Sequence, residues 1–182
     1  MNSRGLGYAI ALGMFLLACR ETYAADDAKD AAAGFSRTYL GLRQSAGLTG
    51  IPNAAQLARL APLITPELAG LFGAALREQQ RCAKQFPGDK PPWIEGDVFS
   101  SHFEGFTSFS AASSKAGKDG REVTMRFTYA EGKQRVNWTD TLILRNVAGR
   151  WLVDDIFYRG QFAFTSGFGN NLKSSLKSIP AC

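Results

Sequence analysis

The chain has 182 residues, of which 45% are hydrophobic, and it carries 21 lysine and arginine residues against 16 aspartate and glutamate residues. This length and hydrophobic content predict one domain with its own packed core and exclude a disordered polymer. A net charge of +5 is too small for a dedicated nucleic-acid binder, and a single histidine excludes a metal site built from several histidines. We therefore expect no nucleic-acid partner, no metal and no cofactor.

Residues 1–24 have the pattern of an export signal. Arg4 supplies a positive charge, and residues 6–18 form an uncharged apolar run. The run is shorter than the roughly 20 residues that a transmembrane helix needs, so we expect cleavage rather than permanent anchoring. In the first interpretation the general signal peptidase cuts after Ala24, which leaves a single α+β domain of residues 25–182.

An alternative signal ends before Cys19. Residues 16–19 resemble the lipobox of bacterial lipoproteins, in which the signal of residues 1–18 is removed and the cysteine becomes a lipid-modified N-terminus. Leu17 departs from that pattern, because alanine or serine is usual at its position. The two alternatives stay open. Both place the domain in the periplasm, and a lipid at Cys19 would be its only contact with the membrane.

Cysteine parity supports export under either alternative. Once Cys19 is removed or lipidated, Cys82 and Cys182 remain as an even pair. In an oxidising periplasm we expect a disulfide between them, closing a loop of about a hundred residues worth roughly 4–5 kcal/mol in the chain-entropy model. Because Cys182 is the last residue, the bond would hold the C-terminal tail against the helix that carries Cys82.

Three helices are predicted in the first half of the mature chain. Apolar residues recur every three or four positions over residues 28–43 and share one face of a helix. Residues 51–53 begin a short second helix. Thr65 suits the cap of a third helix with Pro66 at its first position, and the helical pattern continues to about Gln85.

The second half of the chain is predicted as an antiparallel meander. Glycine-containing turns separate four strands, which cover residues 107–114, 122–129, 136–146 and 150–158. In the third strand Asp140 shares a face with Trp138 and Leu142, so either both faces of that strand are covered or a bulge shifts its register. A short amphipathic helix over about residues 170–177 follows.

Helices followed by a curved four-stranded sheet predict an α+β fold in which the helices cover one face of the sheet. We expect the concave side of the sheet to wrap the long third helix.

Two adjacent aspartates in the last strand are the first candidates for chemistry. Side chains alternate along a strand, so Asp154 and Asp155 are expected on opposite faces of the sheet. A buried aspartate needs a hydrogen-bond partner or a raised pKa, and such a group can act as a general base. The favoured interpretation is structural: one aspartate faces solvent, and the other pairs with an arginine or with backbone N–H groups.

His102 and the tryptophans are weaker candidates. His102 is the only histidine, and no strained nucleophile turn accompanies it, so we interpret it as a solvated loop residue. Trp93 and Trp138 are candidate ligand contacts, because core packing and a pocket in the concave side of the sheet would use the same aromatic side chains.

Four segments together resemble a known bacterial envelope family, and they are residues 90–99, 103–105, 149–156 and 172–176. The most characteristic is the Trp-Leu-Val-Asp-Asp-Ile stretch within residues 149–156. The family is catalogued as domain of unknown function 3828, and it resembles the cone fold called nuclear-transport-factor-2-like or cystatin-like. The resemblance implies this fold for most of the mature chain and brings no established catalytic residues. Some proteins with the cone fold are isomerases or dehydratases, which would make Asp154, Tyr158 and His102 the pocket candidates.

Three functional hypotheses follow from these observations. The first is a non-enzymatic envelope domain that binds a protein or a small ligand. The second is a pocket enzyme with acid–base chemistry at Asp154 or Asp155. The third is an immunity or inhibitor protein against a periplasmic toxin or hydrolase. A filled cone would favour the binding domain, and an open cone with a buried carboxylate that lacks a counter-cation would favour the enzyme.

Overall fold

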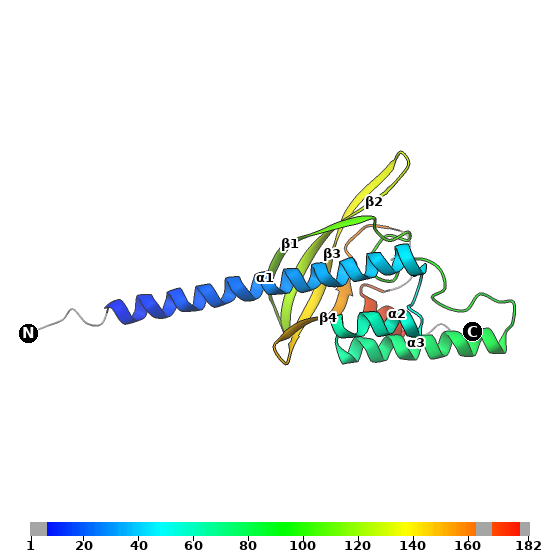
Figure 1. The fold of residues 1–182 in the computed structure, drawn as a ribbon, viewed down its shortest axis with the longest axis horizontal. Helices are drawn as coiled ribbons and strands as arrows, with labels where there is room; N and C mark the ends of the chain where they lie inside the picture. The colour runs from blue at the N-terminus through cyan, green and yellow to red at the C-terminus, as the bar shows by residue number, and fades with distance from the viewer. Residues whose placement is uncertain (1–6, 163–168, 179–182) are drawn as a thin grey trace, which may run out of the picture.

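The computed structural model of the chain is an α+β structure in which helices pack on a curved antiparallel sheet (Figure 1). It describes residues 7–162 and 169–178, with side chains from residue 26 onward. The four strands lie in the sheet in the order of the chain, as consecutive hairpins produce, and the sheet does not close into a barrel. The predicted fold class is therefore confirmed.

The helices are α1 (Gly7–Ala46), α2 (Ala54–Leu60), α3 (Pro66–Gln85) and α4 (Leu172–Lys177), with one 3₁₀ turn, η1 (Ala61–Leu63), between α2 and α3. α2, α3 and α4 begin and end close to their predicted limits, whereas α1 begins well before residue 28, where the first helix was predicted to start. Asn53 caps α2 in a capping box with Gln56. Thr65 caps α3 as predicted, because its hydroxyl accepts a hydrogen bond from the Leu68 N–H at 3.3 Å.

All four predicted strands are present, and each limit lies within three residues of the predicted one. They are β1 (Ser108–Gly117), β2 (Gly120–Glu131), β3 (Gln134–Val147) and β4 (Arg150–Phe157). β2 and β3 pair without interruption, so Asp140 stays on the core face beside Trp138. Neither alternative applies at Asp140: the β2–β3 register is regular there, and Asn137 and Thr139 on the other face are exposed. The bulges lie elsewhere in the sheet.

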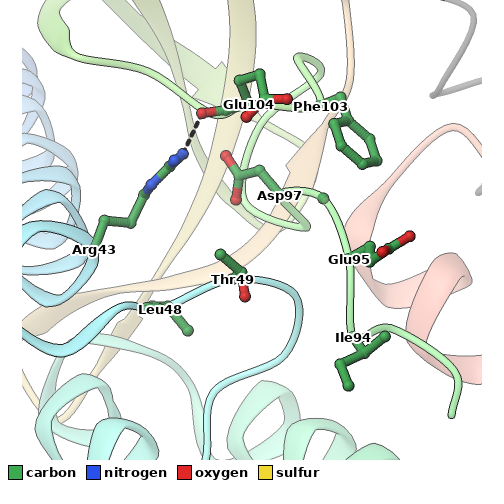
Figure 2. A pocket seen from close by; sticks show the side chains of 9 residues that line it. Arg43, Leu48, Thr49, Ile94, Glu95, Asp97, Phe103 and Glu104 are labelled. Carbon is green, nitrogen blue, oxygen red and sulfur yellow. Dashed lines mark hydrogen bonds between the residues drawn. The ribbon is translucent and has the colours of Figure 1, made fainter. Parts of the chain in front are cut away.

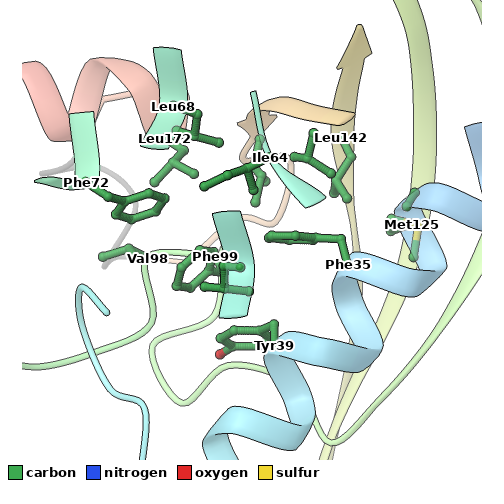
Figure 3. Packing of buried hydrophobic residues seen from close by; sticks show 14 of the residues in the cluster. Phe35, Tyr39, Ile64, Leu68, Phe72, Val98, Phe99, Met125, Leu142 and Leu172 are labelled. Carbon is green, nitrogen blue, oxygen red and sulfur yellow. The ribbon is translucent and has the colours of Figure 1, made fainter. Parts of the chain in front are cut away.

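The concave side of the sheet holds α1, so the prediction that it would wrap the third helix is wrong. α1 contacts all four strands. Figure 3 shows Phe35 and Tyr39 of α1 directed into the core, where the Tyr39 ring lies 4.9 Å from the ring of Phe99. The start of α3 lies beside β4, where the Thr65 N–H donates to the Val153 carbonyl at 2.9 Å.

The segment predicted as an export signal is part of α1, which runs without a break from Gly7 to Ala46. Figure 1 shows the N-terminal half of α1 extending past the sheet. Within the described residues, none of the helices combines the length and the apolarity that crossing a bilayer requires. Cleavage after Ala24 and lipidation at Cys19 both stay predictions.

Cys82 lies on the buried face of α3 with an exposed fraction of 2%, and it is not a free thiol. Cys182 lies outside the described residues, so the Cys82–Cys182 disulfide stays a prediction. Predicted export to an oxidising periplasm leads us to expect that mass spectrometry of protein from that compartment, under non-reducing conditions, finds neither cysteine as a thiol. Two free thiols in that experiment would contradict the predicted bond.

Candidate functional site

The candidate site is an open cavity of about 390 Å³ between the C-terminal end of α1 and the loop that precedes β1 (Figure 2). This volume lies within the range of roughly 300–1,000 Å³ that is usual for small-molecule sites. We call it the Arg43 cavity, and its lining residues are Arg43, Leu48, Thr49, Ile94, Glu95, Gly96, Asp97, Phe103 and Glu104.

One wall of the cavity is a loop held in a strained conformation. Trp93 is buried and has a φ of 53°, which is unusual for a residue other than glycine. Backbone hydrogen bonds fix the loop to the chain after α1: Gly50 N–H donates to the Gly96 carbonyl at 2.6 Å, and Ile51 N–H donates to the Trp93 carbonyl at 3.1 Å. Strained backbone of this kind persists only where the surrounding structure holds it.

Asp97 organises the same loop from inside. Its carboxylate is only 4% exposed and accepts hydrogen bonds from Phe99 N–H at 2.8 Å and from the Ser100 hydroxyl at 2.7 Å. Burial raises the pKa of Asp97 to about 6, although these hydrogen bonds lower it. Asp97 therefore changes charge close to neutral pH.

Arg43 enters the cavity from the last turn of α1. Its Nη1 donates to the Tyr39 hydroxyl at 3.2 Å and to the backbone carbonyl of Glu104 (Figure 2). Among the described residues, nothing accepts a hydrogen bond from its Nε or Nη2. Gly105 makes this arrangement possible, because a Cβ at that position would lie 1.7 Å from Nη1 and 2.8 Å from both Asp97 Oδ2 and Tyr39 Oη.

The titration of Asp97 predicts a pH-dependent contribution to stability. The folded-state pKa is raised from 3.8 to about 6, so this contribution is fully present below pH 3.8 and is lost as the pH rises through about 6. We expect the difference in free energy of unfolding, wild type minus Asp97→Asn, to fall by up to about 3 kcal/mol between about pH 3 and about pH 7.5.

Urea unfolding of both proteins across this pH range measures the difference. Subtracting the variant removes the contributions of the other carboxyl groups. A difference that does not change with pH would show that Asp97 has an ordinary pKa in the folded protein.

Asp154 and Asp155 are both buried, so the expectation that one faces solvent is wrong. A bulge explains the result, because Ile143 pairs with Asp155 whereas Leu144 pairs with Val153, and Asp154 is the extra residue. The bulge interrupts the alternation, and both aspartates line one pocket beside α4 instead of lying on opposite faces.

Each aspartate there has partners, as the structural interpretation predicted for one of them. Asp154 accepts hydrogen bonds from the Thr65 hydroxyl, Arg145 Nε and Lys173 Nζ, each at 2.8 Å. Its pKa is lowered because these hydrogen bonds and the charge of Lys173 outweigh its burial. Asp155 accepts from the backbone N–H groups of Ile156 and Lys173. These partners make both residues anchors for α4 and the edge of β4.

Tyr158 and His102 do not join the aspartates in one site. The Tyr158 hydroxyl donates to the Val98 carbonyl at 2.7 Å, and burial raises its pKa. His102 is half-buried rather than solvated, because its ring stacks against both Tyr129 and Trp138, at centroid distances of 5.0 and 5.1 Å. Burial lowers its pKa, and its Nδ1 has no hydrogen-bond partner within the described part of the chain.

The tryptophan candidates serve mainly as core residues. Trp93 shapes the wall of the Arg43 cavity through its backbone. Trp138 packs on Phe127 and donates from Nε1 to Asp140 at 2.9 Å. No group of acidic, histidine or cysteine side chains suited to a metal is found where the structure describes side chains.

The sequence interpretation missed Arg43, Asp97 and Asp140 as important residues. The signal at Arg43 was weak: a cation four residues after a buried tyrosine, at the end of an apolar stripe. Its partner Glu104 lies 61 positions away. Helix and strand periodicity relate residues only a few positions apart, so they do not predict a contact over this sequence separation.

No family model and no curated protein matches the chain. Among solved structures, the chain is similar to a protein of unknown function from Bacteroides thetaiotaomicron, at 17% identity and a TM-score of 0.43, with 79% of this chain and 98% of that chain covered. A similarity at this level carries no argument about function. The resemblance to the envelope family catalogued as domain of unknown function 3828 stays a prediction.

Proposed function

We propose that the chain is an exported, non-enzymatic binding domain of the cell envelope, and that the Arg43 cavity is its binding site. The observation that carries the proposal is the combination of a half-buried guanidinium with apolar side chains around one opening. Ile94 is 45% exposed and Phe103 is 41% exposed, and both line the cavity. Exposed apolar residues beside a few fixed polar groups are typical of a ligand site.

The filled concave side of the sheet supports a binding domain over a pocket enzyme. α1 and its aromatic contacts occupy the space that an open cone would leave for a substrate. The carboxylate of Asp154 has two counter-cations, Arg145 and Lys173. The enzyme hypothesis requires a buried carboxylate without a counter-cation, so Asp154 does not meet it. Asp97 is held by hydrogen bonds from its own loop, which favours a structural role for it.

Two matched variants test the location of the site. Phe103→Glu places a charge in the apolar wall of the Arg43 cavity, and Phe86→Glu places the same charge at a residue that is 38% exposed at the end of α3. We expect a library of small apolar and anionic compounds, screened by saturation-transfer NMR, to give binders to the wild type. Phe86→Glu should retain these binders, and Phe103→Glu should lose them.

Binders that both variants retain would place the site elsewhere. The absence of any binder from the screen would leave a protein partner, including a toxin in the immunity hypothesis, as the alternative. Affinity capture from the envelope fraction with the wild type and Phe103→Glu then decides between this alternative and no binding function.

A further inference from the structure

The chemistry of the Arg43 cavity is specific enough to indicate a class of ligand. We infer that the Arg43 cavity binds an apolar α-amino carboxylate, with the carboxylate on Arg43, the nitrogen toward the acidic side chains and the apolar side chain against Ile94 and Phe103. This inference rests on the proposed function and deepens it. It concerns a free amino acid or the C-terminal residue of a peptide, which share this chemistry.

The carboxylate position follows from the hydrogen bonds of Arg43. Nη1 is occupied by the Tyr39 hydroxyl and the Glu104 carbonyl, which hold the guanidinium in place. Nε and Nη2 lie on one edge of the planar guanidinium, and within the described residues they have no acceptor. Two parallel N–H groups on one edge match the two oxygens of a carboxylate.

The charges around Arg43 determine what the rest of the ligand must carry. Asp97 and Glu104 line the same cavity, so two carboxyl groups accompany the single guanidinium of the lining. The third acidic residue of the lining, Glu95, is paired with Lys90 at 2.6 Å and is not counted. A dianion such as a phosphate monoester would be repelled by these carboxylates, whereas an ammonium or amide N–H next to the ligand carboxylate would be attracted.

The apolar wall accounts for the remaining part of the ligand. Ile94 and Phe103 lie across the cavity from Arg43 in Figure 2, and both are exposed. Covering these side chains removes apolar surface from water, which favours a ligand with an aliphatic or aromatic side chain. An α-amino carboxylate with such a side chain presents all three groups within a few bonds of one carbon atom.

Calorimetry on the wild-type protein tests the inference without any variant. The first probes are L-leucine, its analogue isocaproate, which lacks the amino group, and L-leucinamide, which lacks the carboxylate. The others are phenyl phosphate, the peptide Gly-Gly-Leu with a free C-terminal carboxylate, and the same peptide with a C-terminal amide. We expect leucine or Gly-Gly-Leu to bind, and the amides, isocaproate and phenyl phosphate to bind at least about tenfold more weakly. Tighter binding of leucine than of the peptide indicates a free amino acid, and the reverse indicates a peptide terminus.

Arginine variants locate the effect. Arg43→Gln should reduce the affinity for the binding probe at least about tenfold, and Arg77→Gln, which removes an exposed charge from α3, should leave it unchanged. Arg43→Lys keeps the charge but loses the planar pair of donors, so it should bind more weakly than the wild type. Thermal melting of each variant shows whether it is folded.

The outcomes separate this inference from the proposed function. Equal binding of leucine and leucinamide, or tighter binding of isocaproate or phenyl phosphate than of leucine, would overturn the inference while leaving a binding cavity. Failure of every probe, when the compound screen still gives binders that Phe103→Glu loses, would also overturn the inference alone. Failure of the probes and of the screen together would remove the small-ligand function.

Discussion

Replacing Asp140 with alanine should lower the free energy of unfolding by roughly 3–5 kcal/mol, because it removes the buried acceptor of several hydrogen bonds. Asp140 has an exposed fraction of 0%. Its oxygens accept from the Ser101 N–H at 2.8 Å, the Ser101 hydroxyl, the Trp138 Nε1 at 2.9 Å and the Arg159 N–H at 2.8 Å. Alanine would leave these donors without an acceptor in the core.

The loss should extend to the candidate site. Ser101 belongs to the loop that also carries Asp97 and Phe103, and Asp140 is the point at which this loop is bonded to the sheet. We therefore expect Asp140→Ala to loosen the Arg43 cavity as well as to destabilise the fold. Amide hydrogen exchange should show faster exchange at residues 97–105 in the variant than in the wild type.

Urea unfolding provides the comparison. Asp140→Asn keeps the shape and one oxygen, so it should lose less stability than Asp140→Ala. Asp89→Ala, in an exposed turn, should stay within about 0.5 kcal/mol of the wild type. A loss at Asp140 no larger than that at Asp89 would contradict the role assigned to this carboxylate.

Gly50→Ala should destabilise the protein by clearly more than Gly47→Ala, although both glycines have a left-handed backbone. Their φ values are 61° and 58°, so each substitution costs about 1–2 kcal/mol from the backbone alone. A Cβ at Gly47 meets nothing within 4 Å. A Cβ at Gly50 would lie 1.8 Å from the Trp93 carbonyl oxygen, which must move.

The two variants separate backbone strain from close packing of the cavity wall. The Trp93 carbonyl accepts from Ile51 N–H, so moving it breaks the contact that fixes the loop beside the Arg43 cavity. We expect Gly50→Ala to lose at least about 2 kcal/mol more than Gly47→Ala in urea unfolding. Equal losses of unfolding free energy in the two variants would mean that the Trp93 carbonyl moves at no cost. The loop beside the Arg43 cavity would then not be fixed by this contact.

The ends of helices and strands could be predicted from the sequence where they depend on residues close together in the chain. Thr65 and Pro66 marked the start of α3 correctly, because capping depends on residues a few positions apart. The glycine-containing turns marked the ends of the strands for the same reason. The prediction of which helix fills the sheet failed, because α1 and α3 both have apolar stripes and an apolar stripe does not show which surface it packs against.

The candidate site was less predictable than the fold. The bulge at Asp154 reversed the expected alternation, and a strand pattern alone does not reveal an extra residue. Arg43, Glu104 and Asp97 come from segments that are adjacent only in space. A single sequence gives the residue types, whereas the direction of the Arg43 guanidinium depends on the Tyr39 hydroxyl and a backbone carbonyl.

The most direct test of the central claim follows the Arg43 guanidinium itself by NMR. During titration with L-leucine or Gly-Gly-Leu, the Nε–Hε signal of Arg43 should shift together with the signals of Leu48, Ile94 and Phe103. In Arg43→Lys, which has no guanidinium, the shifts of the other three residues should be lost. An unchanged Arg43 signal, with shifts instead at Ser110, Arg126 and Thr139, which line a groove on the sheet, would contradict the assignment of the Arg43 cavity as the binding site.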